Sequence, residues 1–152
     1  MSALFNEQQQ ATISQAMQLL ENTLRIPVEF FTRSQITKEW CCLAMAGQER
    51  EVLMVLYLDN QNRLLQSETL FLGTLNCITV HPREVVKAGL RHNAGAVILA
   101  HNHPSGDVTP SRADRDITAQ LERALNLVDI RLLDHLIVGG SRVMSFAEQG
   151  LL

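Results

Sequence analysis

The chain has 152 residues, about the size of one domain, and a chain of this length can bury an ordinary hydrophobic core. Hydrophobic residues make up 46% and charged residues 19% of the sequence, which is typical of a globular protein. The formal net charge of -3, with no Lys/Arg run, leaves no basic footprint for sequence-independent binding to nucleic acid.

The cysteines and the absence of long apolar runs indicate in which cellular compartment the protein is expected. Cys41, Cys42 and Cys77 form no C-x-x-C pair and are odd in number, which favours reduced thiols. The N-terminal segment MSALFNEQQQ has no signal-peptide core, and no apolar run approaches the ~20 residues of a membrane helix. We therefore expect a cytoplasmic protein without a membrane segment.

The N-terminal part of the chain is predicted to be helical. Apolar residues recur at helical spacing over residues 7–24. Ser34 can cap a second helix, which Gly47 would end. We therefore expect a short helical N-terminal extension over residues 1–46, followed by a domain over residues 47–152.

The remainder of the chain mixes strands and helices. Apolar and β-branched runs predict strands over residues 51–59, 63–75, 96–100, 131–140 and 141–147. Helices are predicted over residues 81–95 and 111–127, with a short one at the C-terminus. The class is α/β or α+β, with one sheet and helices packed against it.

The segment AHNHPSGDVTPSRAD has the most informative spacing in the chain. In an extended segment, residues two apart share a face, so His101 and His103 can converge on one ion while Asn102 points away. After a loop rich in proline and glycine, Ser111 and Asp114 share one face of a helix. Two imidazoles and a carboxylate suit zinc and leave a fourth position for water, whose pKa falls to ~7 on such an ion.

Each part of this pattern also has a purely structural interpretation. The two histidines could be ordinary hydrogen-bonding loop residues, and Ser111-x-x-Asp114 fits a helix-capping pattern. Asp107 fits a turn, and His92 fits a helix C-terminus. His135 either holds the second nitrogen of a metal ligand or is a satisfied core histidine. Four positions at fixed offsets in a strand–loop–helix context favour the metal site.

This spacing resembles a known signature. His101-x-His103, seven residues, Ser111, two residues and Asp114 reproduce the H-x-H-x7-S-x2-D pattern of the JAMM (MPN+) metalloproteases. The longer stretch VHPREVVKAGLRHNAGAVILAHNHPSGDVTPSRAD, with LDHLIVGG and SFAE downstream, resembles the RadC-like branch of that family. The resemblance implies a JAB/MPN domain, an α/β fold akin to the cytidine deaminases with a mixed sheet flanked by helices. It also implies one zinc ion held by His101, His103 and Asp114, with Ser111 supporting the transition state.

The family further requires an upstream glutamate as general base, usually in a pattern like E-x-x-G-x-L. The segment EVLMVL offers Glu51-x-x-Met54-x-Leu56, where the spacing holds and Met54 replaces the glycine. Glu49, expected further out on the same strand face, and Glu68, on the next strand, stay open as alternatives.

The resemblance implies a zinc-dependent hydrolase that cleaves peptide or isopeptide bonds in an unidentified peptide or protein substrate. A nucleic-acid-processing role is a second hypothesis, suggested by the DNA-repair name of RadC-like proteins. The negative net charge and the absence of a G-x-G hairpin in the first ~45 residues count against it. A non-catalytic interaction module is a third hypothesis, which the complete ligand set disfavours. The oligomeric state is not determined by these residues.

Overall fold

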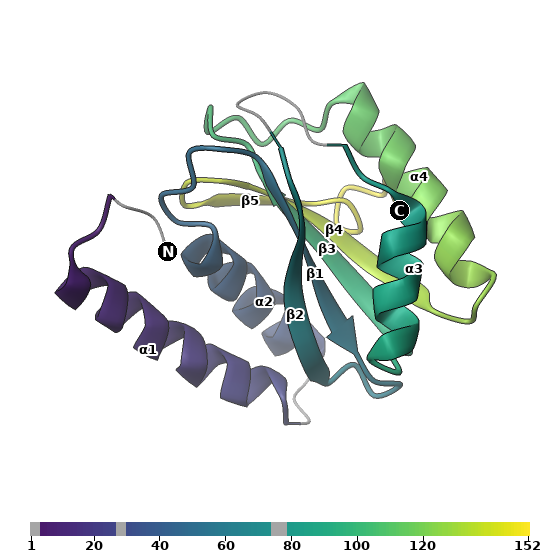
Figure 1. The fold of residues 1–152 in the computed structure, drawn as a ribbon, viewed down its shortest axis with the longest axis horizontal. Helices are drawn as coiled ribbons and strands as arrows, with labels where there is room; N and C mark the ends of the chain where they lie inside the picture. The colour runs from purple at the N-terminus through teal and green to yellow at the C-terminus, as the bar shows by residue number, and fades with distance from the viewer. Residues whose placement is uncertain (1–3, 27–29, 74–78) are drawn as a thin grey trace.

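The computed structural model describes residues 4–26, 30–73 and 79–152, which contain a five-stranded sheet of order β2-β1-β3-β4-β5 (Figure 1). The strands are β1 (Val52–Leu58), β2 (Leu64–Leu72), β3 (Ala96–Asn102), β4 (Arg131–Gly139) and β5 (Arg142–Ser145). β3 and β4 are parallel, and the other neighbouring pairs are antiparallel, so the sheet is mixed. The predicted α/β fold with a mixed sheet is confirmed.

Helices cover both faces of this sheet. They are α1 (Glu7–Leu24), α2 (Phe30–Ala44), α3 (Pro82–Arg91) and α4 (Arg112–Asn126). In Figure 1, α1 and α2 lie on one side of the sheet, and α3 and α4 lie on the other. β3 is buried at every position because both of its faces are covered, which explains its uninterrupted apolar run. Within the described residues, no helix is both long and apolar enough to cross a membrane.

The second helix packs on the sheet and holds the first helix in place. The side chain of Trp40 is 1% exposed, and its indole N–H donates a hydrogen bond to Glu21 of α1 at 3.1 Å. Trp40, Cys41 and Met45 share a core cluster with Leu56 of β1. The two helices of the predicted N-terminal extension are thus in apolar contact with the sheet. The boundary of that extension at residue 46 stays a prediction.

The predicted start of the second helix and the predicted short C-terminal helix are both wrong. α2 begins at Phe30, before Ser34, so Ser34 lies inside the helix. Residues 28–33 contain no glycine or proline that would stop a helix from extending upstream. The short C-terminal helix does not form, because residues 146–150 are turns in which the Ala147 N–H donates to the Asp134 carboxylate. Five residues are too few to offset the cost of helix nucleation.

The cysteines are only partly covered by the structure. Cys41 and Cys42 are free cysteines, and Cys41 is buried. Cys77 lies outside the described residues.

The β3–α4–β4 connection determines where a site can form. The C-terminal end of a parallel strand and the N-terminus of the following helix meet at one edge of the sheet, where ligands commonly bind. His101 lies near the end of β3, and Asp114 lies in the first turn of α4. The loop between them is anchored to the neighbouring strand, because the His103 N–H donates to the Val138 carbonyl at 2.9 Å.

Gly139, at the end of β4, allows this loop to pack closely on the sheet. A Cβ atom at position 139 would lie 2.5 Å from the carbonyl oxygen of Gly106 and 2.8 Å from Cγ1 of Val108. The same Gly106 carbonyl accepts a hydrogen bond from the Arg142 guanidinium. A side chain at position 139 would therefore displace the loop that carries His103.

We predict that Gly139→Ala lowers the free energy of unfolding by about 1–3 kcal/mol, because the added methyl group overlaps backbone atoms of the loop. Urea denaturation measures this change. The control is Ser141→Ala, at an exposed position of the adjacent turn, which should change the stability by less than about 0.5 kcal/mol. Equal stability of Gly139→Ala and the wild-type protein would contradict the steric argument.

Candidate metal centre

Three side chains converge at the C-terminal end of β3. The Nε2 atoms of His101 and His103 lie 2.9 Å apart. Oδ1 of Asp114 lies 3.2 Å from Nε2 of His101, and Oδ2 lies 3.5 Å from Nε2 of His103. One ligand atom from each residue falls within 4.8 Å of the others, so the group could hold a metal ion.

The surroundings of His103 show which of its nitrogens is available to a ligand. Its Nδ1 lies 2.6 Å from the carbonyl oxygen of Asp107, which can only accept a hydrogen bond. Nδ1 therefore carries a hydrogen and donates it, and Nε2 is the atom directed at His101 and Asp114. Two imidazole nitrogens and one carboxylate facing a common point fit a divalent cation such as zinc, which takes nitrogen and oxygen ligands in tetrahedral sites.

A capping box orients the carboxylate of Asp114. Ser111 is the N-cap of α4, and its Oγ accepts a hydrogen bond from the Asp114 N–H at 3.1 Å. In return, Oδ2 of Asp114 accepts the Ser111 N–H at 2.7 Å. The capping interpretation of this pair is thus confirmed, and it is compatible with a ligand role because Oδ1 faces His101.

The electrostatics of the group keep Asp114 charged. Burial raises the pKa of this carboxyl, but its contacts with His101 and His103 outweigh burial and lower the pKa well below its usual range. The hydrogen bond to Asp114 raises the pKa of His103, and the nearby Glu51 carboxylate adds to this effect. An anionic Asp114 is the state that a metal ligand requires.

Glu51 lies beside the histidines, immediately before β1. In the antiparallel pairing of β1 with β3, Leu53 is opposite His101. The pairing ends there, two residues after Glu51, and the next N–H, that of Val52, bonds to the side chain of Asn102. The Glu51 carboxylate lies close enough to His103 to help raise its pKa, so the candidate general base is near the candidate metal ligands.

Asn102, between the two histidines, fastens the backbone on both sides of Glu51. Its Oδ1 accepts a hydrogen bond from the Val52 N–H at 2.8 Å, and its Nδ2 donates to the Arg50 carbonyl at 3.0 Å. The Asn102 residue is only 4% exposed. The sequence predicts that Asn102 points away from the ion. It does not predict these hydrogen bonds, because they join residues about fifty positions apart.

The two alternative candidates for the general base, Glu49 and Glu68, lie in different surroundings from Glu51. Glu49 lies in an exposed bend before β1, so the expectation that it shares a strand face with Glu51 is wrong. Glu68 of β2 is paired with Arg91 and His92 at the C-terminal end of α3. Of the three glutamates, Glu51 is the one that acts on the pKa of His103.

Two further polar residues have structural roles that the sequence allowed. The Asp107 carboxylate accepts hydrogen bonds from the N–H and the hydroxyl of Thr109, at 2.9 and 2.8 Å, so it stabilises a turn of the loop. His92 is the C-cap of α3 and contacts Glu68. Neither belongs to the group of candidate metal ligands.

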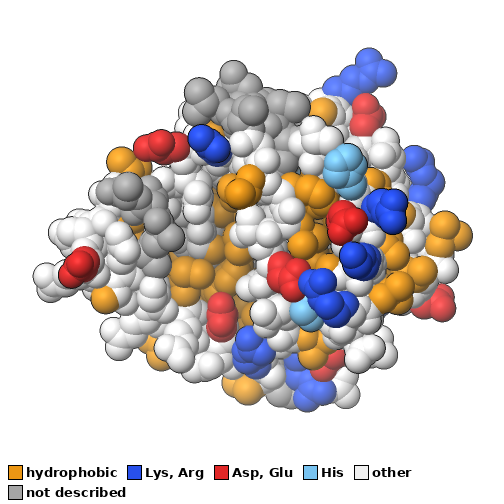
Figure 2. Space-filling model, in the orientation of Figure 1, with side chains coloured by type: hydrophobic (Ala, Val, Ile, Leu, Met, Phe, Trp, Pro, Cys, Tyr) orange, Lys and Arg blue, Asp and Glu red, His pale blue; other side chains and the backbone are white. Residues whose placement is uncertain are grey.

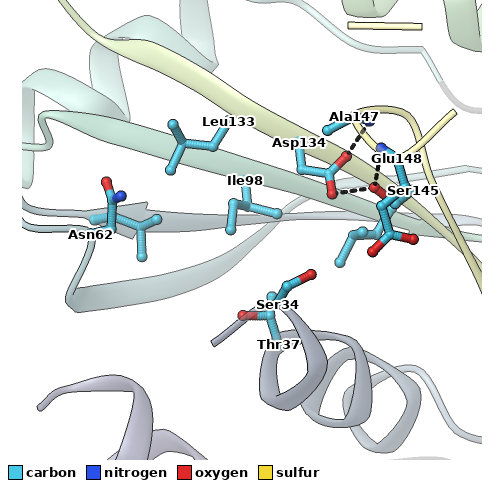
Figure 3. Close-up of a pocket in the computed structure, with 11 residues that line it drawn as sticks. Ser34, Thr37, Asn62, Ile98, Leu133, Asp134, Ser145, Ala147 and Glu148 are labelled. Atoms are coloured by element: carbon cyan, nitrogen blue, oxygen red, sulfur yellow. Dashed lines mark hydrogen bonds between the residues drawn. The ribbon is translucent and has the colours of Figure 1, made fainter. Parts of the chain in front are cut away.

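A cavity of about 470 Å³ lies on the other face of the sheet, against α2 (Figure 3). Ile98 and Leu133 contribute to its apolar wall. Asp134, at one end, accepts hydrogen bonds from the Ser145 hydroxyl and the Ala147 N–H. Ile98 belongs to the core cluster on the α2 side, whereas His101 shares the opposite face with Leu99. This cavity is therefore separate from the candidate metal centre.

A mixed sheet flanked by helices, with a His-His-Asp group between a strand end and a helix start, defines an α/β domain of the JAB type. The chain belongs to the RadC-like JAB domain family, whose sequence model matches residues 31–151. The resemblance predicted from the motif is thus confirmed.

Relatives match most of the chain. The chain is 58% identical over 144 residues to the UPF0758 protein YeeS of Escherichia coli (strain K12), covering 95% of this chain and 97% of YeeS. It is 57% identical to the UPF0758 protein YfjY of the same organism, covering 94% of this chain and 89% of YfjY. It is also 57% identical to UPF0758 protein PSHAa2643 of Pseudoalteromonas translucida, covering 80% of this chain and 54% of that protein. These names state no activity.

We predict that the wild-type protein binds about one equivalent of zinc and that His103→Ala and Asp114→Asn bind it much more weakly. Asp114→Asn keeps an acceptor for the Ser111 N–H, so it separates the capping role from the ligand role. Isothermal titration calorimetry after treatment with chelator measures the affinities. His81→Ala, at the exposed N-cap of α3, is the control and should bind zinc like the wild type. Wild-type affinity in His103→Ala would contradict the assignment.

The pH dependence of stability tests the structural role of Glu68. Burial raises the pKa of Glu68, but hydrogen bonds from His92 and Arg91 outweigh burial and lower it. A depressed pKa means that Glu68 stabilises the fold above its unfolded-state pKa of about 4.3, and that this contribution is lost as the pH falls through the folded-state value. We expect the stability advantage of the wild type over Glu68→Gln in urea denaturation to shrink below about pH 4. A constant difference at all pH values would argue against the ion pairs.

Proposed function

We propose that the protein is a zinc-dependent hydrolase that cleaves peptide or isopeptide bonds. The observation that carries this proposal is the convergence of His101, His103 and Asp114. The nearby Glu51 carboxylate, which acts on the pKa of His103, supports it. The family includes hydrolases, and the signature that the chain shares with it is complete. A peptide or protein chain is the proposed substrate.

Each residue of the group has a distinct task in this proposal. His101 and His103 would bind the ion through Nε2, and Asp114 would bind it through its carboxylate. When bound, zinc supplies Lewis acidity and a water molecule whose pKa is lowered to about 7. Glu51 accepts a proton at its carboxylate and later returns one to the leaving amine, as a general base and acid does.

In this proposal, Ser111 would donate a hydrogen bond to a substrate oxygen. Its Oγ accepts the Asp114 N–H at the start of α4, so the proton of the hydroxyl group is left to be donated elsewhere. A donor next to the ion would stabilise negative charge on the carbonyl oxygen of the substrate. The capping contact holds the hydroxyl in place for this task.

The charges on one face of the molecule favour a peptide substrate over a nucleic acid. The face in Figure 2 shows Lys/Arg and Asp/Glu side chains interspersed rather than gathered by sign. Arg91 pairs with Glu68, and Arg83 lies 3.9 Å from Glu84. Binding to nucleic acid depends on a basic surface that neutralises phosphates, and mixed charges of this kind provide a poor one.

We predict that cleavage of a fluorogenic peptide library or of isopeptide-linked peptides stops on addition of chelator and returns with zinc. Glu51→Gln should lower the rate by about 100-fold or more, because it removes the proton acceptor, while zinc affinity is retained. Glu49→Gln is the matched control and should keep wild-type activity, because Glu49 lies in the exposed bend. Chelator-resistant cleavage, or unchanged turnover by Glu51→Gln, would overturn this mechanism.

A further inference from the structure

A chain of buried polar contacts runs behind His101, away from the metal position. Nδ1 of His101 lies 2.8 Å from Nε2 of His135, and Nδ1 of His135 lies 2.6 Å from Oγ1 of Thr118. The hydroxyl of Thr118 contacts the carbonyl oxygen of Asp114 at 2.5 Å. The exposed fractions of His101, His135 and Thr118 are 2%, 1% and 2%. This series of hydrogen bonds thus begins at the side chain of one candidate ligand, His101, and ends at the backbone of another, Asp114.

The carbonyl group at the end of this series determines the direction of every hydrogen bond in the series. The Asp114 carbonyl can only accept, so the single proton of the Thr118 hydroxyl points toward it. Nδ1 of His135 must then donate to Thr118. Burial favours a neutral imidazole, which has one N–H, so Nε2 of His135 accepts the Nδ1–H of His101. His101 therefore has its hydrogen on Nδ1 and a lone pair on Nε2.

The fold holds His135 firmly in the position that this chain requires. The Asp134 carboxylate accepts the His135 N–H at 2.7 Å, and the His135 carbonyl accepts the Phe146 N–H at 3.0 Å. The His135 ring stacks on Phe146, with the centroids 4.8 Å apart and the planes 26° apart. β4 and the C-terminal turn together thus prevent the ring from rotating away from His101.

We propose that Thr118 and His135 are positioning residues of the metal centre, which hold His101 in the tautomer whose Nε2 lone pair faces His103 and Asp114. This inference rests on the proposed metal centre. Polar groups in an apolar core are costly unless they are hydrogen-bonded. These contacts satisfy Nδ1 of His101, both nitrogens of His135 and the Thr118 hydroxyl, and they leave Nε2 of His101 for an ion. A core built only for stability could use apolar side chains at these positions.

The first test compares the zinc dissociation constants of Thr118 variants in the full-length chain, measured by competition with a chromogenic chelator. Thr118→Val has the same shape but no hydroxyl, and we expect it to weaken zinc binding by about 10- to 100-fold. Thr118→Ser restores the hydroxyl and should return the affinity to within a few-fold of the wild type. Leu121→Val, one turn further along the buried face of α4, controls for lost packing and should leave the affinity unchanged.

These outcomes separate the inference from the proposed function. If the wild type binds zinc and Thr118→Val binds it equally well, the positioning role is overturned while the metal centre stands. If the wild type binds no zinc, the metal centre itself is overturned. A loss of affinity in Leu121→Val equal to that in Thr118→Val would assign the effect to packing and would also overturn the positioning role.

The second test needs no variant. Nitrogen chemical shifts from NMR of the ¹⁵N-labelled wild-type protein at mildly alkaline pH distinguish the two neutral histidine tautomers. We expect His135 to carry its hydrogen on Nδ1, with Nε2 unprotonated. A hydrogen on Nε2 of His135 would reverse the direction of the contact with His101 and overturn the inference.

Discussion

Two imidazole nitrogens held 2.9 Å apart beside a carboxylate are the arrangement on which the rest of the site depends. Neutral imidazoles do not attract one another in this geometry, because lone pairs that face each other repel. A proton or a cation between the nitrogens removes the repulsion, and the charged Asp114 carboxylate favours either. The parallel β3–α4–β4 unit supplies the geometry, since it brings a strand end and a helix start to one edge of the sheet.

The helix start of α4 serves two purposes with the same atoms. The capping box satisfies backbone N–H groups that every helix leaves without partners, and it also fixes the rotamer of Asp114. One carboxylate oxygen faces the backbone of Ser111, and the other faces His101. Asp114 can therefore cap the helix and act as a metal ligand at the same time. This is why the motif alone could not separate them.

The two faces of the sheet differ in what they bury. The face toward α2 is covered by a cluster that includes Trp40 and Leu56 and is apolar around the cavity of Figure 3. The face toward α4 begins as an apolar cluster and ends in the histidine pair. Tolerating two imidazoles and a hydroxyl in this interior requires complete hydrogen bonding. That requirement accounts for the continuous series of hydrogen bonds behind His101.

Residue types and short-range spacing determined much of this protein: the α/β class, the strand order in the chain, the H-x-H pair on one strand face and the serine–aspartate pair on one helix turn. These features depend on local periodicity, which a sequence contains directly. Only the tertiary structure showed that Glu51, rather than Glu49 or Glu68, acts on the pKa of His103, because folding brings together segments about fifty residues apart. The tertiary structure was also needed to connect Thr118 and Asn102 to the site. Their hydrogen bonds join separate elements and depend on packing, which no periodic pattern in the sequence indicates.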